Sequence, residues 1–154
     1  MNFGVEIPFV SHLGFELEKF ENGDSAIGYS PKPEHLNSFA VTHGGVVMTL
    51  MDVTMAVAAR SVQLDMGVVT IEMKTSFMRP APGDGSRLTA KGRLMHHTAT
   101  LAFTEATLFD AQGGACAHST GTFKYVKRLV TGLKTSHALT GIKSPMPQSG
   151  ISTD

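Results

Sequence analysis

One stretch of the chain limits the possible folds more than any other, because it combines a strong helical preference with a single charge. Residues 44–60 contain no proline, are rich in Met, Val and Ala, and predict the main helix of the protein. Asp52 is the only ionisable side chain in residues 44–59, and Arg60 ends the stretch. On a helical wheel, an apolar stripe suited to face a sheet is formed by Val46, Leu50, Val53 and Val57.

The second face of this helix is also unsuited to water. Asp52 shares that face with small and apolar residues, namely Gly45, Met48, Met55, Ala56 and Ala59. A solvent-facing surface would carry Lys, Glu or Arg, so the helix is predicted to be covered on both sides, most simply by another subunit. A carboxylate under cover costs free energy, which favours a functional role for Asp52. The alternative is a structural pair with a nearby Lys or Arg.

Alternating segments on both sides of the helix predict strands. Leu13–Leu17 and Ala26–Tyr29 flank an Asn-Gly-Asp turn and predict a hairpin. After Gly67 the period is two, which places Val69, Ile71, Met73 and Phe77 on one face of a strand and Thr70, Glu72, Lys74 and Ser76 on the other.

Three further strands are expected near Ser86–Met95, Thr100–Phe109 and Ala115–Val126, joined by short turns as an antiparallel meander. The expected plan is α+β, with one helix packed on one antiparallel sheet in the order ββ-α-ββββ. It places a single domain in residues 1–130. Residues 131–154 are rich in Ser, Thr, Gly and Pro and are expected to be a flexible C-terminal tail.

Composition excludes several classes of protein. Thirteen basic and thirteen acidic residues cancel, and no basic stripe suggests a nucleic-acid or membrane surface. A single cysteine, Cys116, offers no internal disulfide. The N-terminal residues do not resemble a secretory signal, and no apolar stretch is long enough to span a membrane. The expected location is the cytoplasm.

The residues just before the helix suit the binding of a polarised oxygen. His43-Gly44-Gly45 lets a ligand approach the backbone, and a helix N-terminus presents unpaired N–H groups. A Gly-Gly pair is also common as a plain turn. From Gly44 to Asp52 is about 12 Å along a helix axis, so one carbonyl group cannot touch both on the same helix. A two-fold dimer with antiparallel helices would bring one chain's helix start beside the other chain's Asp52.

The motifs in their order resemble a known family. His35-Leu-Asn37, His43-Gly44-Gly45 and Leu50-Met-Asp52, with Asn six residues before the His and Asp nine after it, resemble the hotdog-fold thioesterases of the PaaI-like (phenylacetate-pathway) and acyl-CoA thioesterase 13-like type. The resemblance runs from about residue 15 to residue 126, through Val69-Thr70-Ile-Glu-Met, Phe77-Met-Arg-Pro, Gly83-Asp84 and Gly121-Thr-Phe.

This resemblance implies hydrolysis of an acyl-CoA to a free acid and CoA by a homodimer or a dimer of dimers. Asp52 would be the general base that activates water, or the nucleophile. The N–H of Gly44 would bind the thioester oxygen with help from the Asn37 side chain, and Thr70 would hold the attacking water. On the substrate side the candidates are His43, Gly45 and Met48, although His43 could equally be structural.

The implied chemistry requires no metal and no cofactor, since CoA is part of the substrate. His96 and His97 are neighbours on a strand, where side chains point to opposite faces, so no metal site is expected there. The turn that follows lacks a cation for the CoA phosphates, which leaves Arg79, Lys124, Lys127 or Arg128 as candidates. Three alternatives stay open: a thioesterase acting on an acyl-carrier protein, a non-catalytic acyl-CoA-binding or sensing module, and a hotdog dehydratase or hydratase.

Overall fold

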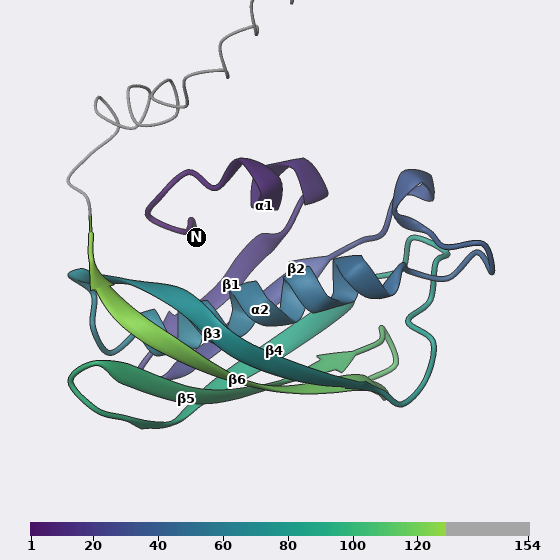
Figure 1. Ribbon diagram of the computed structural model, residues 1–154. Coiled ribbons are helices and arrows are strands. Elements are labelled where there is room, and N and C mark those ends of the chain that lie inside the picture. Colours follow the sequence, from purple (N-terminus) through teal and green to yellow (C-terminus); the bar gives the residue numbers. More distant parts are fainter. Residues whose placement is uncertain (129–154) are drawn as a thin grey trace, which may run out of the picture.

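The long helix α2, Gly44–Arg60, has the bounds expected from the sequence, and the other elements are arranged around it (Figure 1). The computed structural model describes residues 1–128. Around α2 they form two short helical segments and six strands: α1 (Pro8–Leu13), β1 (Glu16–Glu21), β2 (Asp24–Tyr29), the 3-10 turn η1 (Pro33–His35), β3 (Met66–Phe77), β4 (Leu88–His97), β5 (Leu101–Phe109) and β6 (Ala115–Lys127).

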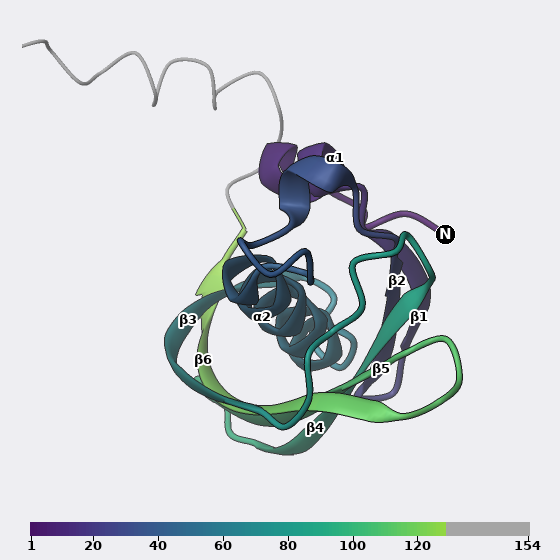
Figure 2. The ribbon, with the colours of Figure 1, turned by 90° about the vertical axis from the view of Figure 1, so that its right-hand side faces the viewer.

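The six strands form one antiparallel sheet in the order β1-β2-β4-β5-β6-β3. The predicted meander of β4, β5 and β6 is confirmed, as is the order ββ-α-ββββ of the α+β fold. β3 follows α2 in the chain but pairs with β6, so it is an edge strand of the sheet. The sheet curves around α2 and encloses it on more than one side, which is the hotdog arrangement (Figure 2).

The face of α2 that meets the sheet is wider than the predicted stripe and is rotated from it. Leu50 and Val57 are buried as expected, but Val46 and Val53 are only half-buried. On the predicted second face, Met55 and Ala59 are fully buried by the same chain, because the curved sheet covers a broad arc of the helix. The residues of that face left at least partly open are Gly45, Met48, Asp52 and Ala56.

The N-terminal hairpin begins later than predicted. Leu13 ends helix α1, and β1 starts only at Glu16. Pro8 opens this helix, and Gly14 closes it with a φ of 77° and N–H bonds to the carbonyls of Val10 and Ser11. Six residues are too few to give a recognisable helical period, so the sequence pattern did not reveal α1. The predicted tail, residues 131–154, lies outside the described residues.

Gly92 of β4 allows the backbone of α2 to approach the sheet closely. A Cβ atom at Gly92 would lie 2.9 Å from the carbonyl oxygen of Thr54, in the middle of the helix. The Ser25 hydroxyl donates a 2.6 Å hydrogen bond to this same oxygen. The position of α2 over the sheet therefore depends on the absence of a side chain at residue 92.

We expect Gly92→Ala to lower the free energy of unfolding by about 1–3 kcal/mol, as overpacking of a tight core does. Gly67→Ala is the matched control, because a Cβ atom there would make an ordinary 3.5 Å contact with Val126 and the backbone does not have a positive φ. Chemical denaturation of both variants tests this. Equal effects at the two positions would show that the close approach at Gly92 is unimportant.

Candidate functional site

The first turn of α2 leaves one backbone donor open. The side chain of His43 caps the helix, because its Nδ1 accepts a 2.8 Å hydrogen bond from the Gly45 N–H. The N–H groups of Val46 and Val47 both donate to the carbonyl of His43. Within residues 1–128, no acceptor pairs with the N–H of Gly44. An open N–H at the positive end of a helix is a suitable donor for a carbonyl oxygen that gains charge.

His43 therefore has a structural task, which was one of the two predicted alternatives. Its cap also occupies the Gly45 N–H, so this backbone donor is engaged within the chain. The side chain of Phe77, at the end of β3, approaches Gly44: a Cβ atom there would lie 3.5 Å from the aromatic ring. Roles of His43 and Gly45 toward a substrate stay predictions.

Asn37 lies in a loop that fixes which end of its amide is available. Its Oδ1 accepts hydrogen bonds from the N–H groups of Phe39 (2.9 Å) and Val41 (3.3 Å). The Nδ2 group has no acceptor among the described residues and remains a free donor. Ala40 holds a φ of 59°, which is strained for a residue with a side chain.

Neighbouring segments hold this loop in place. The hydroxyl of Thr42 donates a 2.7 Å hydrogen bond to the carbonyl of Pro82, and the Thr42 N–H bonds to Ala81. Gly83 lies so close to the carbonyl of Ala40 that any side chain at residue 83 would overlap it. The Asn37 amide and the start of α2 thus belong to one rigid unit.

The second part of the site joins α2 to strand β3. The hydroxyl of Thr70 donates a 2.6 Å hydrogen bond to Oδ1 of Asp52. This contact depends on a β-bulge, since the register passes from Thr70 opposite Phe123 to Glu72 opposite Thr122 and leaves Ile71 without a partner. The prediction that Thr70 lies on the face of Glu72 is therefore wrong.

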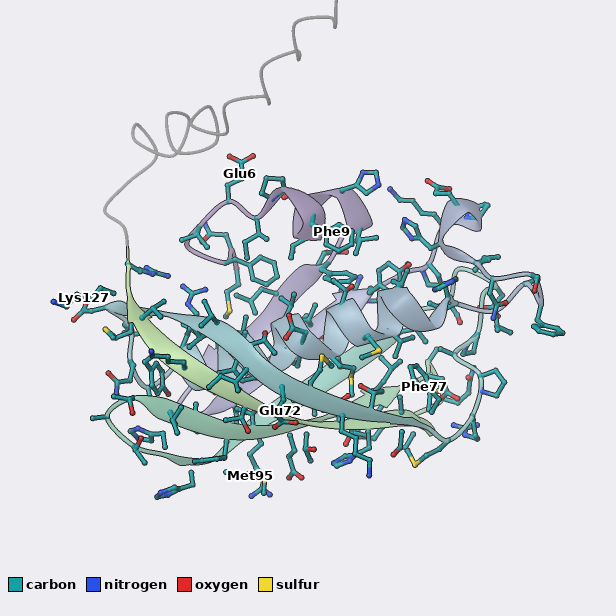
Figure 3. All side chains as sticks on the ribbon, viewed as in Figure 1. Glu6, Phe9, Glu72, Phe77, Met95 and Lys127 are labelled. Carbon is teal, nitrogen blue, oxygen red and sulfur yellow. The ribbon has the colours of Figure 1, made fainter. Side chains whose placement is uncertain are left out.

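The bulge changes the alternation of β3. Thr70 faces the helix together with Met73 and Phe77, while Val69 pairs with Lys124 on the outer side. The predicted strict alternation fails because the extra residue moves the side chains that precede it in β3 to the opposite face of the sheet. Figure 3 shows Glu72 on the outer surface and Phe77 at the end of the same strand.

The surroundings of Asp52 make its carboxylate a stronger base than an exposed one. Burial raises the pKa of Asp52 above its ordinary value, and the hydrogen bond from Thr70 opposes that shift in part. Within residues 1–128, neither a Lys nor an Arg forms an ion pair with it. The alternative of a structural ion pair is therefore wrong for this part of the chain. A half-buried base beside a hydroxyl is suited to take a proton from water.

The predicted residues thus form two groups, not one. Asn37 and Gly44 lie at the start of α2, whereas Asp52 and Thr70 lie two turns along it, about 12 Å away at 1.5 Å per residue. Met48 lies between them on the open face of the helix and is 37% exposed. One chain alone does not bring the four catalytic candidates around one carbonyl carbon.

Three of the cationic and histidine positions considered from the sequence make contacts within the chain. Arg79 pairs with Asp110 at 3.2 Å and donates to the carbonyl of Ala115. His96 stacks on Phe103, while His97 meets Tyr125 edge to face, so the two histidines do point to opposite sides of the sheet. Lys124 and Lys127 are exposed on β6.

Comparison with known proteins identifies the family. Residues 39–117, about half of the 154 residues, match the family described as Thioesterase superfamily. The chain belongs to the thioesterase superfamily. The predicted enzyme class, a thioester hydrolase, is therefore confirmed. A curated relative, the medium/long-chain acyl-CoA thioesterase YigI of Salmonella typhimurium, is 25% identical over 139 residues, with 79% of this chain and 87% of that protein covered.

Comparison with solved structures confirms the hotdog fold. The PaaI protein of the Escherichia coli phenylacetic acid degradation operon superposes with a TM-score of 0.73 at 21% identity, covering 80% of this chain and 87% of that one. The smu.793 protein of Streptococcus mutans, solved bound to acetyl-CoA, gives a TM-score of 0.71 at 20% identity, covering 82% and 97%. The predicted similarity to PaaI is confirmed for the fold.

The raised pKa of Asp52 predicts a pH-dependent cost to the fold of this thioesterase. The folded carboxyl group keeps its proton at a pH where the unfolded one has lost it, so stability falls as the pH rises through that interval. Asp52→Asn should therefore be more stable than the wild type at neutral pH, and the difference should shrink as the pH approaches 4, roughly the ordinary carboxyl range. Thermal melts across pH measure it.

Asp110→Asn is a control of opposite sign. Hydrogen bonds, first from the Gly114 N–H, lower the pKa of Asp110, so its ionised form stabilises the fold at neutral pH and that stability is lost as the pH falls. This variant should be less stable than the wild type at neutral pH. If both substitutions shifted stability in the same direction, burial of Asp52 would not be the cause.

Proposed function

We propose that this thioesterase hydrolyses an acyl-CoA to a free carboxylic acid and CoA by attack of a water molecule that Asp52 activates. The observation that carries the proposal is the 2.6 Å bond from Thr70 to a carboxylate whose burial raises its pKa. The acyl-CoA class is supported by the name of the YigI relative and by the acetyl-CoA bound to the Streptococcus protein.

Each polar group has a place in the reaction. The N–H of Gly44 and the Nδ2 of Asn37 donate to the thioester oxygen and stabilise the charge that develops on it. Asp52 takes a proton from water, and the resulting hydroxide bonds to the carbonyl carbon. The carbon–sulfur bond then breaks, and the proton passes to the CoA thiolate. Thr70 donates to Asp52 and can accept a hydrogen bond from the water, which orients it for attack.

A second copy of the chain completes the site in this proposal. β3 is an edge strand, and its outer residues Val69 and Ile71 are about half exposed. An apolar edge with unpaired backbone groups favours pairing with another strand. Two-fold pairing there would bring the open faces of two α2 helices together, each Asp52 near the partner's helix start. A homodimer is the minimal assembly, and a homotetramer would pair two of them.

The need for a cofactor and the location in the cell follow from this chemistry. The reaction uses no metal and no cofactor, since the protein groups named above supply both the base and the donors. Among the helices of residues 1–128, none is long and apolar enough to cross a membrane. We propose a cytoplasmic location, where acyl-CoA substrates are available. Thiol release is measured with a panel of acyl-CoAs. If none of them releases thiol, the substrate is a carrier-protein thioester, or the protein binds acyl-CoA without turnover.

Asp52→Asn retains the shape of the side chain and removes the base. We expect turnover to fall by roughly a hundredfold or more, with substrate binding largely kept. Thr70→Ala should cost less, because the hydroxyl orients water without taking its proton. Steady-state thiol release over a range of pH measures both. Near-normal turnover of Asp52→Asn would refute Asp52 as the base. A larger loss in Thr70→Ala than in Asp52→Asn would mean that the roles proposed for these two residues must be exchanged.

The shared site is tested with mixed dimers of Asn37→Ala and Asp52→Ala chains. If each site takes Asn37 from one chain and Asp52 from the other, a mixed dimer has one intact site. Random exchange makes about half of the dimers mixed, so activity should recover to about a quarter of the wild type. A mixture of Asp52→Ala with Asp52→Asn is the control and should not recover. No recovery after verified subunit exchange would mean that each site lies within one chain.

A further inference from the structure

A groove lies between the two short helical segments and the start of α2. It has a volume of about 460 Å³, and its walls come from α1, η1 and the first turn of α2. Both short segments contribute to its lining, and Figure 2 shows them on the same side of α2. Most of its lining is apolar and includes Phe9, Leu13, Leu36 and Val46. The groove reaches His43 and Gly45, so it adjoins the open N–H of Gly44.

One buried polar residue lines this groove. His35 is only 5% exposed, and its ring stacks on Tyr29 with the ring centres 5.7 Å apart. Its Nδ1 accepts a hydrogen bond from the backbone N–H of Lys32 at 3.3 Å and contacts the Tyr29 hydroxyl at 2.5 Å. Because Nδ1 accepts from the Lys32 N–H, it carries no proton, and the Tyr29 hydroxyl must donate to it. Burial, with a smaller effect of Glu34, raises the pKa of Tyr29 to about 12.

These partners assign the tautomer of His35. A ring nitrogen that accepts two hydrogen bonds carries no proton, so the proton of the neutral ring is on Nε2. No hydrogen bond joins Nε2 to another group of residues 1–128. Every fully enclosed side-chain nitrogen or oxygen in that part of the chain has a partner. Nε2–H must therefore reach open space, and the open space that His35 lines is the groove.

We propose that the groove binds an apolar arm of the thioester substrate that carries a carbonyl or hydroxyl oxygen, and that the Nε2–H of His35 donates to this oxygen. The proposal rests on the proposed thioester hydrolysis for the identity of the substrate. Nε2–H has no acceptor among residues 1–128, and a ligand that displaces water from the groove keeps this hydrogen bond only if it offers an acceptor, which favours an oxygen over a plain hydrocarbon.

Two parts of an acyl-CoA offer this chemistry. One is an oxygen on the acyl chain itself, and the other is an amide carbonyl of the pantetheine arm. Phe9 of α1, 56% exposed, supplies apolar surface for either (Figure 3). In either case His35 would select the substrate, because it would recognise an oxygen that is remote from the bond that breaks.

A matched pair of variants isolates the donor. In His35→Asn the side-chain oxygen replaces Nδ1 as the acceptor for Tyr29, and the donor toward the groove is lost. In His35→Gln the amide reaches the position of Nε2 and keeps a donor there. Two ratios of kcat/KM are compared: 3-hydroxydecanoyl-CoA against decanoyl-CoA, and decanoyl-CoA against the decanoyl thioester of propanethiol, which has no amides.

We expect one ratio to fall roughly three- to tenfold in His35→Asn, the effect of one lost neutral hydrogen bond, and to be kept in His35→Gln. A fall in the first ratio identifies the acyl oxygen, and a fall in the second the pantetheine amide. If neither ratio moved in a folded His35→Asn protein, or if both variants changed a ratio equally, the proposal would be refuted.

A measurement without turnover covers the case in which the variants do not fold. In the Asp52→Asn protein with His35 intact, the nitrogen resonances of His35 should show a proton on Nε2. The Nε2 resonance should shift when 3-hydroxydecanoyl-CoA is added to saturation, as judged by calorimetry. No shift at saturation would overturn the groove assignment. If instead the wild type hydrolysed no thioester while the resonance shifted, only the proposed function would fail.

Discussion

A single helix enclosed by its own sheet determines most of what this chain can do. The curved sheet covers a broad arc of α2, and Gly92 lets it approach the helix backbone within van der Waals contact. Only the face with Met48 and Asp52 remains partly open. Because α2 is one continuous helix of 17 residues, the donor at its start and the carboxylate along it are held about two turns apart. Any reaction that needs both requires a second helix.

The bulge at Ile71 has a chemical consequence as well as a structural one. Without the extra residue, Thr70 would point away from the helix, and Asp52 would have no hydroxyl partner. Ile71 itself is exposed at the edge of the sheet, where a second copy of the chain would pair. A single irregularity in β3 therefore orients the candidate base and shapes the proposed subunit contact. Bulges next to active sites commonly have this role of redirecting a side chain.

The sequence predicted the helix, the order of the elements along the chain and the meander of β4, β5 and β6, because these depend on local preference. Its short motifs singled out the four catalytic candidates, whose roles stay predictions. It did not predict that Thr70 faces the helix, since alternation alone has no signal for a bulge. α1 was missed because six residues show no period, and the stripe on α2 was misplaced because the curvature of the sheet depends on long-range pairing. His35 stood in the matching motif without a role, because its tautomer depends on Tyr29 and Lys32, which no spacing reveals.

The loop from η1 to α2 connects the groove to the candidate catalytic groups. His35 lies at its start, Asn37 in its middle and His43 at its end, and the His43 N–H donates back to the carbonyl of His35. Asn37 uses its oxygen to hold the loop, and His43 uses Nδ1 to cap the helix, so in each side chain one nitrogen has no partner among residues 1–128. His35 follows the same pattern. A ligand held by His35 would therefore sit on the same rigid unit that carries the Gly44 donor, which fixes the thioester oxygen relative to the arm that the groove binds.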